Sequence, residues 1–306
     1  MRLLFMGTSE FALPSLERLA QEHDVAGVFT KADKPAHRGM KVKKGVIKTW
    51  AEKHHIPVFT PSRLDDREIT RCREIAPDCI AVVSYGLKIP REILDIPSFG
   101  ALNAHASLLP RYRGSSPVNA AVLNGEAVSG VTVFRLNEEW DAGDILLKKE
   151  ISLDERETAS SLWEKLRFLS ADALSETLAR IDEITPLPQE DEKATFAMKI
   201  TKEDARISWN NEAGIVDRLV RGYFSWPGAY TTLNGKTVKI LGGFPAEEKH
   251  LAEPGTILGV DPEQGIKVAC GTGVFYITDL QMECKRAMSF KDFLNGCPLC
   301  AGEMFL

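Results

Sequence analysis

The residues with the clearest chemical potential lie in the stretch from Leu102 to Gly114, which reads LNAHASLLPRYRG. Asn103 and His105 are two residues apart, so their side chains point to the same side of an extended chain. Pro110 follows shortly afterwards and interrupts regular structure. We therefore expect the end of a strand that runs into a shaped loop, with an amide and an imidazole facing one space.

A carboxylate follows 36 residues after the histidine, because WDAGD at 140–144 places Asp141 in a turn between two strand-like runs. An amide can donate to an oxyanion, an imidazole can carry a proton, and a carboxylate can stabilise a charged imidazole. This combination suits acyl transfer, in which a carbonyl passes through a tetrahedral oxyanion. No Ser or Cys lies in a nucleophile elbow, which favours direct attack by a substrate group on a bound acyl donor. The alternative is structural: Asn103 ends a strand, His105 is a half-buried histidine with ordinary partners, and Asp141 caps a turn.

The elements that would position these residues alternate along the first half of the chain. Apolar strand-like runs and helical patterns follow one another, with strands expected at 2–6, 24–30, 57–59, 79–84, 100–103, 130–136 and 145–151, and helices at 10–21, 66–75, 91–94 and 116–124. Such alternation predicts a mostly parallel, Rossmann-like sheet with helices on both faces, an α/β fold. Ligands of these sheets bind at the carboxyl ends of the strands. We therefore expect the segments 85–90 and 103–110 and the turn at Asp141 to line one crevice.

The length of 306 residues predicts about two domains. A long amphipathic helix is expected over 158–182, and the proline-containing, acidic stretch EITPLPQEDEKA at 183–194 then reads as a linker. We predict a catalytic domain at 1–182, a linker at 183–203 and a second domain at 204–306. In the second domain, Asn234-Gly235 marks a hairpin. Further short strands predict a small β-barrel, for which the oligonucleotide-binding (OB) fold is one candidate.

The charge pattern limits the possible partners. The net charge is -5, so contact with nucleic acid would need a local basic patch. Residues 31–53 provide one, with eight Lys or Arg against two acids. This segment is either a solvated loop followed by a cationic helix or a surface that contacts a phosphate backbone.

Several functional classes fit the sequence poorly. The first turn reads GTSEF rather than GxGxxG, which argues against a nicotinamide oxidoreductase. No apolar run approaches the ~20 residues of a membrane span, and the N-terminal apolar run is short for a secretory signal. We therefore expect a cytoplasmic protein that does not contact a membrane. Cys297 and Cys300 form a CxxC without a second pair or zinc-spaced histidines, so we expect no metal site.

Longer motifs add a family resemblance. NAHASLLPRYRG with SSPVNAAVLNGE, followed by GVTVFRLNEEWDAGD, closely resembles the formyltransferases that use 10-formyltetrahydrofolate. LLFMGTSEFALPSLERL, DKPAHRGMKVK, VVSYGLKIP and the pattern PGTIL…GIKVACGTG…LQ…MSFKDFLNG are similar to the bacterial branch that formylates initiator methionyl-tRNA. The resemblance covers nearly the whole chain. It implies a Rossmann-like formyltransferase domain and a C-terminal barrel of the OB type.

The resemblance also implies roles for individual residues. The family's catalytic residues fall on Asn103, His105 and Asp141. Its folate-binding motif falls on Ser107, Leu108, Leu109 and Pro110, and its backbone-lined pterin pocket on the turn that contains Tyr85, Gly86, Leu87 and Ile89. Its basic loop for the tRNA acceptor end falls on Lys34, Arg38, Lys41, Lys43 and Lys44, with Arg38 at the position of an important arginine.

The implied reaction is attack by the α-amino group of methionyl-tRNA on the formyl carbon. Asn103 and His105 would hold the oxyanion, Asp141 would support a charged His105, and no metal would be needed. The implied partners are initiator methionyl-tRNA and the folate co-substrate, and we expect a monomer. Two alternatives remain: a related enzyme acting on a small amine, and a non-catalytic tRNA-binding protein. The chain differs from the family pattern before the aspartate, at Asn137, Glu139 and Trp140, which bears on the pterin fit.

Overall fold

The computed structural model describes residues 1–36 and 41–306, and only the backbone of 34–36 and 41–43. The chain forms two compact units, each assembled from three segments. We call them the N-terminal unit (Met1–Pro117, Val128–Ser152 and Trp163–Ala197) and the C-terminal unit (Val118–Ala127, Leu153–Leu162 and Met198–Leu306). The predicted domain limits at 182 and 204 stay a proposal, because compactness does not test which segments fold independently.

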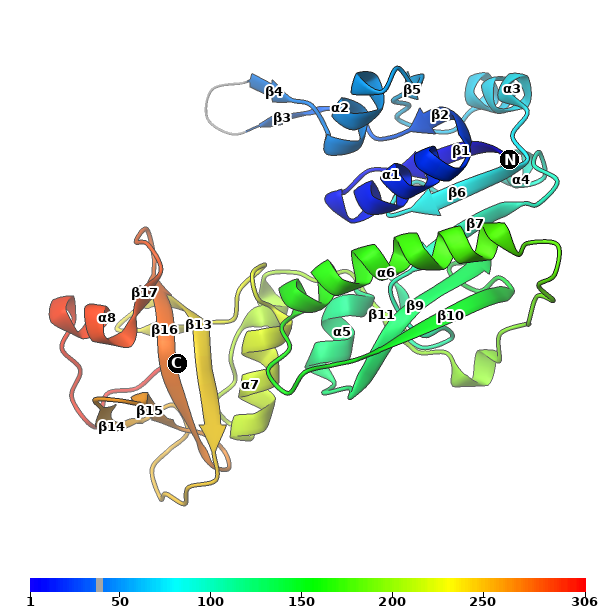
Figure 1. Ribbon diagram of the computed structural model, residues 1–306. Helices are drawn as coiled ribbons and strands as arrows, with labels where there is room; N and C mark the ends of the chain where they lie inside the picture. Colours follow the sequence, from blue (N-terminus) through cyan, green and yellow to red (C-terminus); the bar gives the residue numbers. More distant parts are fainter. Residues whose placement is uncertain (37–40) are drawn as a thin grey trace. The chain divides into compact units, whose positions relative to one another are not determined.

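A seven-stranded sheet forms the centre of the N-terminal unit (Figure 1). Its strand order is β10-β9-β7-β6-β1-β2-β5, with β1 Arg2–Gly7, β2 Asp24–Phe29, β5 Val58–Phe59, β6 Cys79–Val83, β7 Ala101–His105, β9 Val128–Arg135 and β10 Ile145–Ser152. Neighbouring strands from β5 to β7 are parallel, whereas β9 runs antiparallel to β7 and β10 antiparallel to β9. The prediction of a mostly parallel sheet is confirmed.

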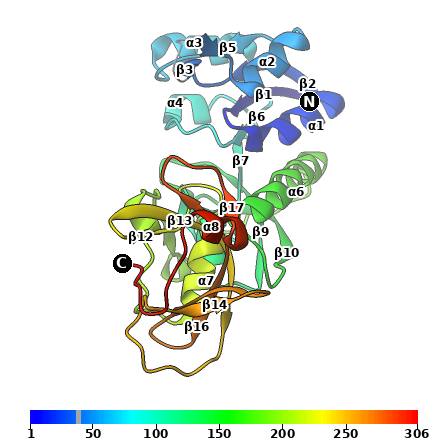
Figure 2. The same ribbon diagram turned by 90° about the vertical axis from the view of Figure 1, so that its left-hand side faces the viewer.

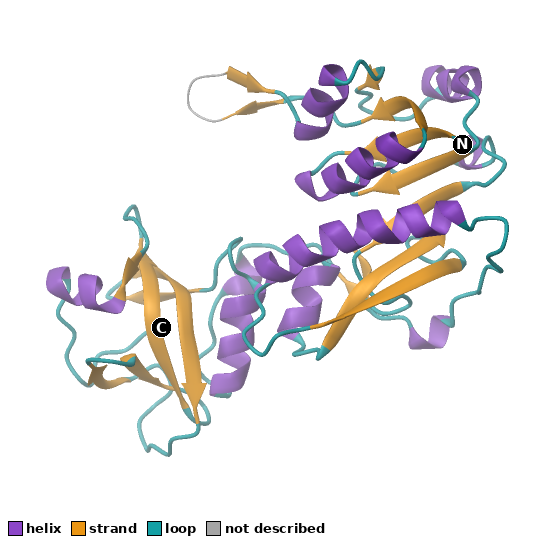
Figure 3. Ribbon diagram, in the orientation of Figure 1, coloured by secondary structure: helices purple, strands orange, loops and turns teal. Residues whose placement is uncertain are grey.

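Helices cover both faces of this sheet (Figures 1 and 3). The α-helices whose residues belong mainly to this unit are α1 Leu13–Glu22, α2 Val46–Lys53, α3 Asp66–Ile75, α4 Arg91–Leu94 and α6 Ala159–Ala179. One face packs on α3 and α4, where Leu4 and Ile80 join Cys72 and Ile93 in one apolar cluster. Strand side chains alternate between the two faces. The helices α1 and α6 lie on the other face, and an ion pair from Arg18 on α1 to Asp172 on α6 connects them.

Two short strand pairs were not predicted. In the basic segment, β3 Lys34–Ala36 and β4 Lys41–Lys43 pair as an antiparallel hairpin. The prediction of a loop was wrong for these residues, because strands of three residues are too short for their sequence pattern to be told from that of a loop. β8 Arg113–Gly114 pairs in parallel with β11 Phe196–Ala197, so the linker returns to the loop after β7.

The C-terminal unit is built on a curled antiparallel sheet (Figure 2). Its order is β12-β13-β16-β15-β14, with β12 Tyr230–Leu233, β13 Lys236–Ala246, β14 Ile257–Asp261, β15 Gly265–Ala269 and β16 Val274–Met282; β17 Met288–Ser289 also pairs with β16. The helix α7 Ala213–Gly222 packs on β13 and β16, and α8 Phe290–Gly296 follows β17. A small β unit was predicted, and this is confirmed.

The last residues of the chain close this sheet. The backbone of Leu306 exchanges two hydrogen bonds of 2.9 Å with Thr232 on β12. Glu303 accepts at 2.7 Å from Ile257 N at the start of β14. Phe305 lies between these contacts, is 1% exposed and stacks on Trp209 at 5.8 Å. Residues 303–306 therefore join the two edge strands into a ring.

An ion-pair network fastens the earlier chain segments into the C-terminal unit. Buried Asp217 on α7 binds Arg156 and Arg221, each at 2.7 Å. Arg221 Nη1 also donates to the Glu157 carbonyl at 2.7 Å. The helix α5 Pro117–Leu123 contributes as well, because the Asn119 amide donates to the Gly222 carbonyl at 2.8 Å. This unit therefore depends on residues that precede the linker by many positions.

Candidate active site

The strand β7 carries the first two candidate residues, as the spacing predicted. It lies between β6 and β9 in the sheet and ends at His105, which is 7% exposed. Asn103, on the same side of the strand, is half-buried. Its amide has no hydrogen-bond partner within the described part of the chain. The amide therefore keeps its N–H donors for a ligand.

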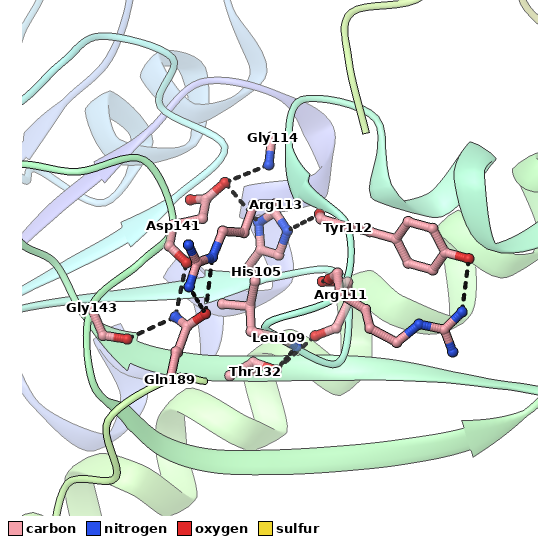
Figure 4. Close-up of polar contacts among 11 residues, drawn as sticks. His105, Leu109, Arg111, Tyr112, Arg113, Gly114, Thr132, Asp141, Gly143 and Gln189 are labelled. Atoms are coloured by element: carbon pink, nitrogen blue, oxygen red, sulfur yellow. Dashed lines mark hydrogen bonds and ion pairs between the residues drawn. The ribbon is translucent and has the colours of Figure 1, made fainter. Parts of the chain in front are cut away.

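His105 faces Asp141, so the structure brings the predicted pair together (Figure 4). The distance from His105 Nδ1 to Asp141 Oδ2 is 3.7 Å, and both side chains are buried. On the other side of the ring, Nε2 lies 2.9 Å from the Tyr112 carbonyl. A carbonyl can only accept, so Nε2 carries a proton here and Nδ1 is the atom that faces the carboxylate.

Asp141 reaches His105 by a different path from the one that the alternation of strands and helices predicted. The strand β9 is antiparallel to β7, with Leu102 opposite Arg135 and His105 opposite Thr132. The end of β9 therefore lies level with the start of β7, so the turn does not begin at the same edge of the sheet as the loops after β6 and β7, as the crevice prediction assumed. The loop instead folds back from the end of β9 to bring Asp141 to the histidine.

The sequence of the turn permits this path. Asp141 has a left-handed backbone with φ 50°. Gly143 passes so close to β9 that a Cβ atom there would lie 1.7 Å from the Arg135 carbonyl oxygen. Only glycine fits such an approach. The Asp144 carbonyl then accepts from Arg135 N at 2.9 Å, which fixes the turn against the strand.

The SLLP loop divides into structural and accessible residues. Thr132 Oγ1 accepts from Leu109 N at 3.0 Å and donates to the Ser107 carbonyl at 2.7 Å. The buried Ser107 hydroxyl donates to the Arg111 carbonyl at 2.7 Å, and the Leu109 side chain is fully buried. These residues hold the loop in shape. The two half-buried members of the motif remain to contact a ligand, namely Leu108 and Pro110.

The turn after β6 offers mainly backbone. Tyr85 is 2% exposed and packs in the apolar cluster beneath α3 and α4, where burial raises the pKa of its phenol. Ile89 belongs to the same cluster, and Leu87 packs against it. Gly86 is exposed with φ 72°. If this turn binds a pterin, it does so through the backbone near Gly86.

Two groups that touch the Asp141 turn were missed by sequence reasoning. Gly114 N donates to Asp141 Oδ2 at 2.8 Å (Figure 4). The Gln189 amide donates to the carbonyls of Asp141 and Gly143, at 2.8 Å each. A backbone amide has no sequence signature, and Gln189 lies in the predicted linker, so neither residue carried a signal.

The segment that differs from the family pattern is a solvent-facing turn. The Asn137 side chain accepts from Glu139 N at 3.0 Å, and Trp140 is 68% exposed. Trp140 therefore presents an accessible indole next to Asp141.

The predicted tRNA-binding residues lie in the β3–β4 hairpin and beside it. Lys34, Lys41 and Lys43 are in its strands, and Arg38 lies outside the described residues. Lys44 is exposed and pairs with Glu52 at 2.7 Å. At the base of the hairpin, Asp33 binds Lys48 at 2.6 Å and accepts from the backbone of the residue before α2, and these contacts lower the pKa of its carboxyl group.

Neither a membrane-spanning helix nor a metal-binding cluster occurs in the part of the chain that the structure describes. No helix among the described residues is both long enough and apolar enough to cross a membrane. No group of three or more His, Cys, Asp or Glu side chains in the same part of the chain is arranged to hold a metal ion.

Comparison with known proteins defines the class. Residues 1–178 match the formyl transferase family, and residues 199–298 match the formyl transferase C-terminal domain. The chain therefore belongs to the formyl transferase family, as the motifs predicted.

Individual relatives show which formyl transferases the chain is similar to. The chain is 42% identical over 301 residues to the methionyl-tRNA formyltransferase of Geobacter metallireducens, covering 97% of this chain and 96% of that protein. Its fold matches HypX from Aquifex aeolicus in complex with tetrahydrofolic acid, at 20% identity and a TM-score of 0.62 over the whole chain, which spans 50% of HypX. It also matches WlaRD, a sugar 3N-formyl transferase, at 18% identity and a TM-score of 0.66 over 94% of this chain and 99% of that one.

Proposed function

We propose that this protein transfers the formyl group of 10-formyltetrahydrofolate to the α-amino group of initiator methionyl-tRNA. The observation that carries the proposal is the buried pair of His105 and Asp141 beside the available amide of Asn103. This arrangement occurs in a chain that is 42% identical to a methionyl-tRNA formyltransferase over nearly its whole length.

The chemistry requires a neutral amine and a stabilised oxyanion. Free α-amines titrate at about 7.7–8.0, so a base must take a proton from much of the substrate near neutrality. The amine nitrogen then forms a bond to the formyl carbon, and the carbonyl oxygen becomes an oxyanion. After it has bonded to carbon, the attacking nitrogen gives up one further proton. When the tetrahedral intermediate collapses, its bond to the folate nitrogen breaks, and that nitrogen receives this proton.

The geometry divides this work between the three residues. The Asn103 amide is available to donate to the oxyanion. His105 Nε2 is engaged by the Tyr112 carbonyl. We therefore assign the oxyanion contact first to Asn103, rather than equally to both residues, and proton movement to His105. Asp141 stabilises the positive charge that develops on the imidazole.

The residues near the candidate pair offer the surfaces that a folate would contact. Leu108 and Pro110 offer half-buried apolar surface, and the exposed backbone near Gly86 offers polar groups to a heterocycle. A tetrahydrofolate-bound structural neighbour has the same fold. These features support 10-formyltetrahydrofolate as the co-substrate.

The basic hairpin supplies the contact with tRNA in this proposal. Its cationic residues would neutralise phosphates of the acceptor end, namely Lys34, Arg38, Lys41, Lys43 and Lys44. The exposed pair of Lys44 with Glu52 is no obstacle, since surface ion pairs are weak and exchange readily. We further propose that the protein acts as a cytoplasmic monomer.

A transfer assay with competing acceptors tests the proposal. The protein is incubated with 10-formyltetrahydrofolate carrying a labelled formyl group and with charged initiator tRNA, and formyl-methionine is measured after hydrolysis. Charged elongator tRNA, an amino sugar nucleotide and glycinamide ribonucleotide are parallel acceptors. We expect label only on methionyl-tRNA, with initiator preferred. Transfer to a small amine alone would assign a different substrate, and no transfer to any acceptor would contradict the enzymatic proposal.

A further inference from the structure

The linker residue Gln189 contacts two segments at once: the turn that contains Asp141, and Arg113 in β8 (Figure 4). Its Nε2 donates to the backbone carbonyls of Asp141 and Gly143, at 2.8 Å each. Its Oε1 accepts from Arg113 Nε at 3.1 Å and from Arg113 Nη2 at 2.9 Å. Arg113 is 6% exposed and is the residue before Gly114.

These contacts complete a ring around the catalytic carboxylate. Gly114 N donates to Asp141 Oδ2, so β8 holds the side chain of Asp141, whereas Gln189 holds its backbone. The Arg113 side chain connects these two sets of contacts, because Arg113 precedes Gly114 in the chain and binds Gln189. Asp141 has a left-handed backbone, a conformation that non-glycine residues keep only where neighbouring contacts enforce it.

The chemistry of these contacts requires an amide at position 189. Arginine has only donors, so the atom that faces Arg113 must accept. Backbone carbonyls have only acceptors, so the atom that faces Asp141 and Gly143 must donate. Glutamate could satisfy the arginine but would place an acceptor against two carbonyl oxygens. The isosteric change from Gln to Glu therefore separates the two halves of the contact.

The linker residues around Gln189 also bind both the Asp141 turn and the loop after β7. On the side of the turn, Leu187 and Ile145 exchange backbone hydrogen bonds of 2.8 and 2.9 Å. On the side of the loop after β7, Arg113 N donates to the Thr195 carbonyl at 2.8 Å, and Tyr112 N donates to Thr195 Oγ1 at 2.9 Å. The carbonyl of the same Tyr112 contacts His105. The linker therefore braces both residues of the catalytic pair.

We infer that Gln189 is a positioning residue for formyl transfer and that it ties the linker to the active site. Gln189 does not touch the reacting atoms, and it acts by fixing the backbone of Asp141 so that the carboxylate faces His105. This inference rests on the proposed function for its kinetic consequence. Its structural consequence, an ordered Asp141 turn, does not depend on which acceptor the enzyme uses.

Variants at position 189 test the kinetic consequence. Gln189→Ala and Gln189→Glu are each expected to lower kcat about 10- to 100-fold, the range for a small misplacement of a catalytic group. The KM values for tRNA and folate should stay within about twofold, because the amide is already occupied by Arg113 and by the carbonyls of Asp141 and Gly143. The matched control is Lys193→Ala, which removes the exposed pair with Glu190 in the same linker and should keep the wild-type rate.

A double variant separates positioning from general damage to the fold. If Gln189 acts through Asp141, then adding Gln189→Ala to Asp141→Asn should reduce kcat no further than Asp141→Asn alone. Two losses that multiply would overturn the inference, as would wild-type kcat in Gln189→Glu. Thermal unfolding of each variant identifies any that fail to fold.

Hydrogen exchange of the Gly114 amide gives a readout that does not need activity. This amide is protected by the Asp141 carboxylate, so Gln189→Ala should accelerate its exchange, whereas Lys193→Ala should leave it unchanged. Unchanged exchange in both variants would contradict the inference even if wild-type transfer is normal. If the wild-type protein transfers no formyl group, the proposed function fails, and the exchange result still decides whether Gln189 positions Asp141.

Discussion

At the scale of single residues, the site depends on a buried carboxylate next to a buried imidazole. Burial around His105 and Asp141 excludes water that would otherwise screen their interaction. Backbone groups then fix both side chains, because the Tyr112 carbonyl contacts the imidazole and the Gly114 amide contacts the carboxylate. The pair is therefore oriented before any substrate arrives.

His105→Ala and Asp141→Asn test this pair. Each change is expected to lower kcat by about 10²–10⁴, the usual contribution of a positioned proton-transfer group. Asparagine can still accept from Gly114 N, so Asp141→Asn should keep the fold, which thermal unfolding would verify. Asp144→Asn changes an exposed carboxylate in the same turn and is the matched control. Near-normal turnover of either test variant would remove that residue from the mechanism.

Burial also affects residues outside the site. Burial raises the pKa of the Cys79 thiol to about 12, whereas an unfolded cysteine titrates at about 8.5. Above pH 8.5 the unfolded chain loses this proton and the folded chain keeps it, so the free energy of unfolding falls as pH rises toward 12. The buried thiols of Cys72 and Cys270, with their pKa values also raised to about 12, add to this effect.

Urea unfolding at pH 8 and pH 10 measures the contribution of one thiol. We expect Cys79→Ala to lessen the loss of stability between these values by on the order of 1 kcal/mol, since one pKa unit corresponds to about 1.4 kcal/mol. Cys284→Ala removes an exposed thiol and should leave the pH dependence as it is. An identical pH dependence of stability in Cys79→Ala and wild type would show that the Cys79 thiol does not contribute to the loss of stability at high pH.

At the scale of elements, short strand pairings perform tasks that the large sheet does not. The pair β8–β11 attaches the linker to the loop after β7, and the hairpin β3–β4 carries the basic segment. Both pairings are too short to bury much apolar surface. Their value lies in presenting side chains and backbone amides, which is the role of irregular segments in many enzymes.

Salt dependence tests the basic hairpin. Each phosphate contact contributes to the fall of affinity with salt. Arg38→Ala and Lys41→Ala should therefore each raise the KM for tRNA. Each should also reduce the slope of log KM against log salt by the amount that corresponds to roughly one phosphate contact. The KM for folate should not change. Lys148→Ala removes an exposed positive charge on β10 and serves as the control. Unchanged KM and slope would mean that the hairpin is only a solvated surface.

At the scale of the whole molecule, each compact unit is completed by chain that is distant in sequence. The N-terminal unit includes residues of the linker, and the C-terminal unit includes 118–127 and 153–162. The same holds within the C-terminal sheet, which residues 303–306 close. Neither unit corresponds to one uninterrupted piece of the chain.

Phe305→Ala tests the closure of the C-terminal sheet. Phe305 is 1% exposed against Trp209, so truncation should lower the free energy of unfolding by about 3–5 kcal/mol, the range for a buried Phe. Urea unfolding followed by circular dichroism measures the change. Leu251→Ala, at a fully exposed position, should be close to neutral. A loss below about 1 kcal/mol in Phe305→Ala would show that the closing segment is dispensable.

The sequence by itself determined most of the local elements and pointed to the candidate pair of His105 and Asp141. The helix α3 matches its predicted bounds because Asp65 caps its first turn and the left-handed Ala76 ends it, both of which are local effects. Asn234-Gly235 marked its hairpin in the same way. The types and spacing of Asn103, His105 and Asp141 suited proton transfer beside an oxyanion but left a structural role open, and the family resemblance is what favoured the catalytic interpretation.

Only the tertiary structure decided how the pair is assembled. The direction of β9 follows from packing of the whole sheet, so the path by which Asp141 reaches His105 could not be predicted from alternation. The Gly114 amide and the Gln189 side chain bind Asp141 across separations of 27 and 48 residues. Contacts of this kind depend on chain geometry rather than on local propensity. For that reason the sequence indicated which residues are candidates for the chemistry, and the fold alone showed what holds them in place.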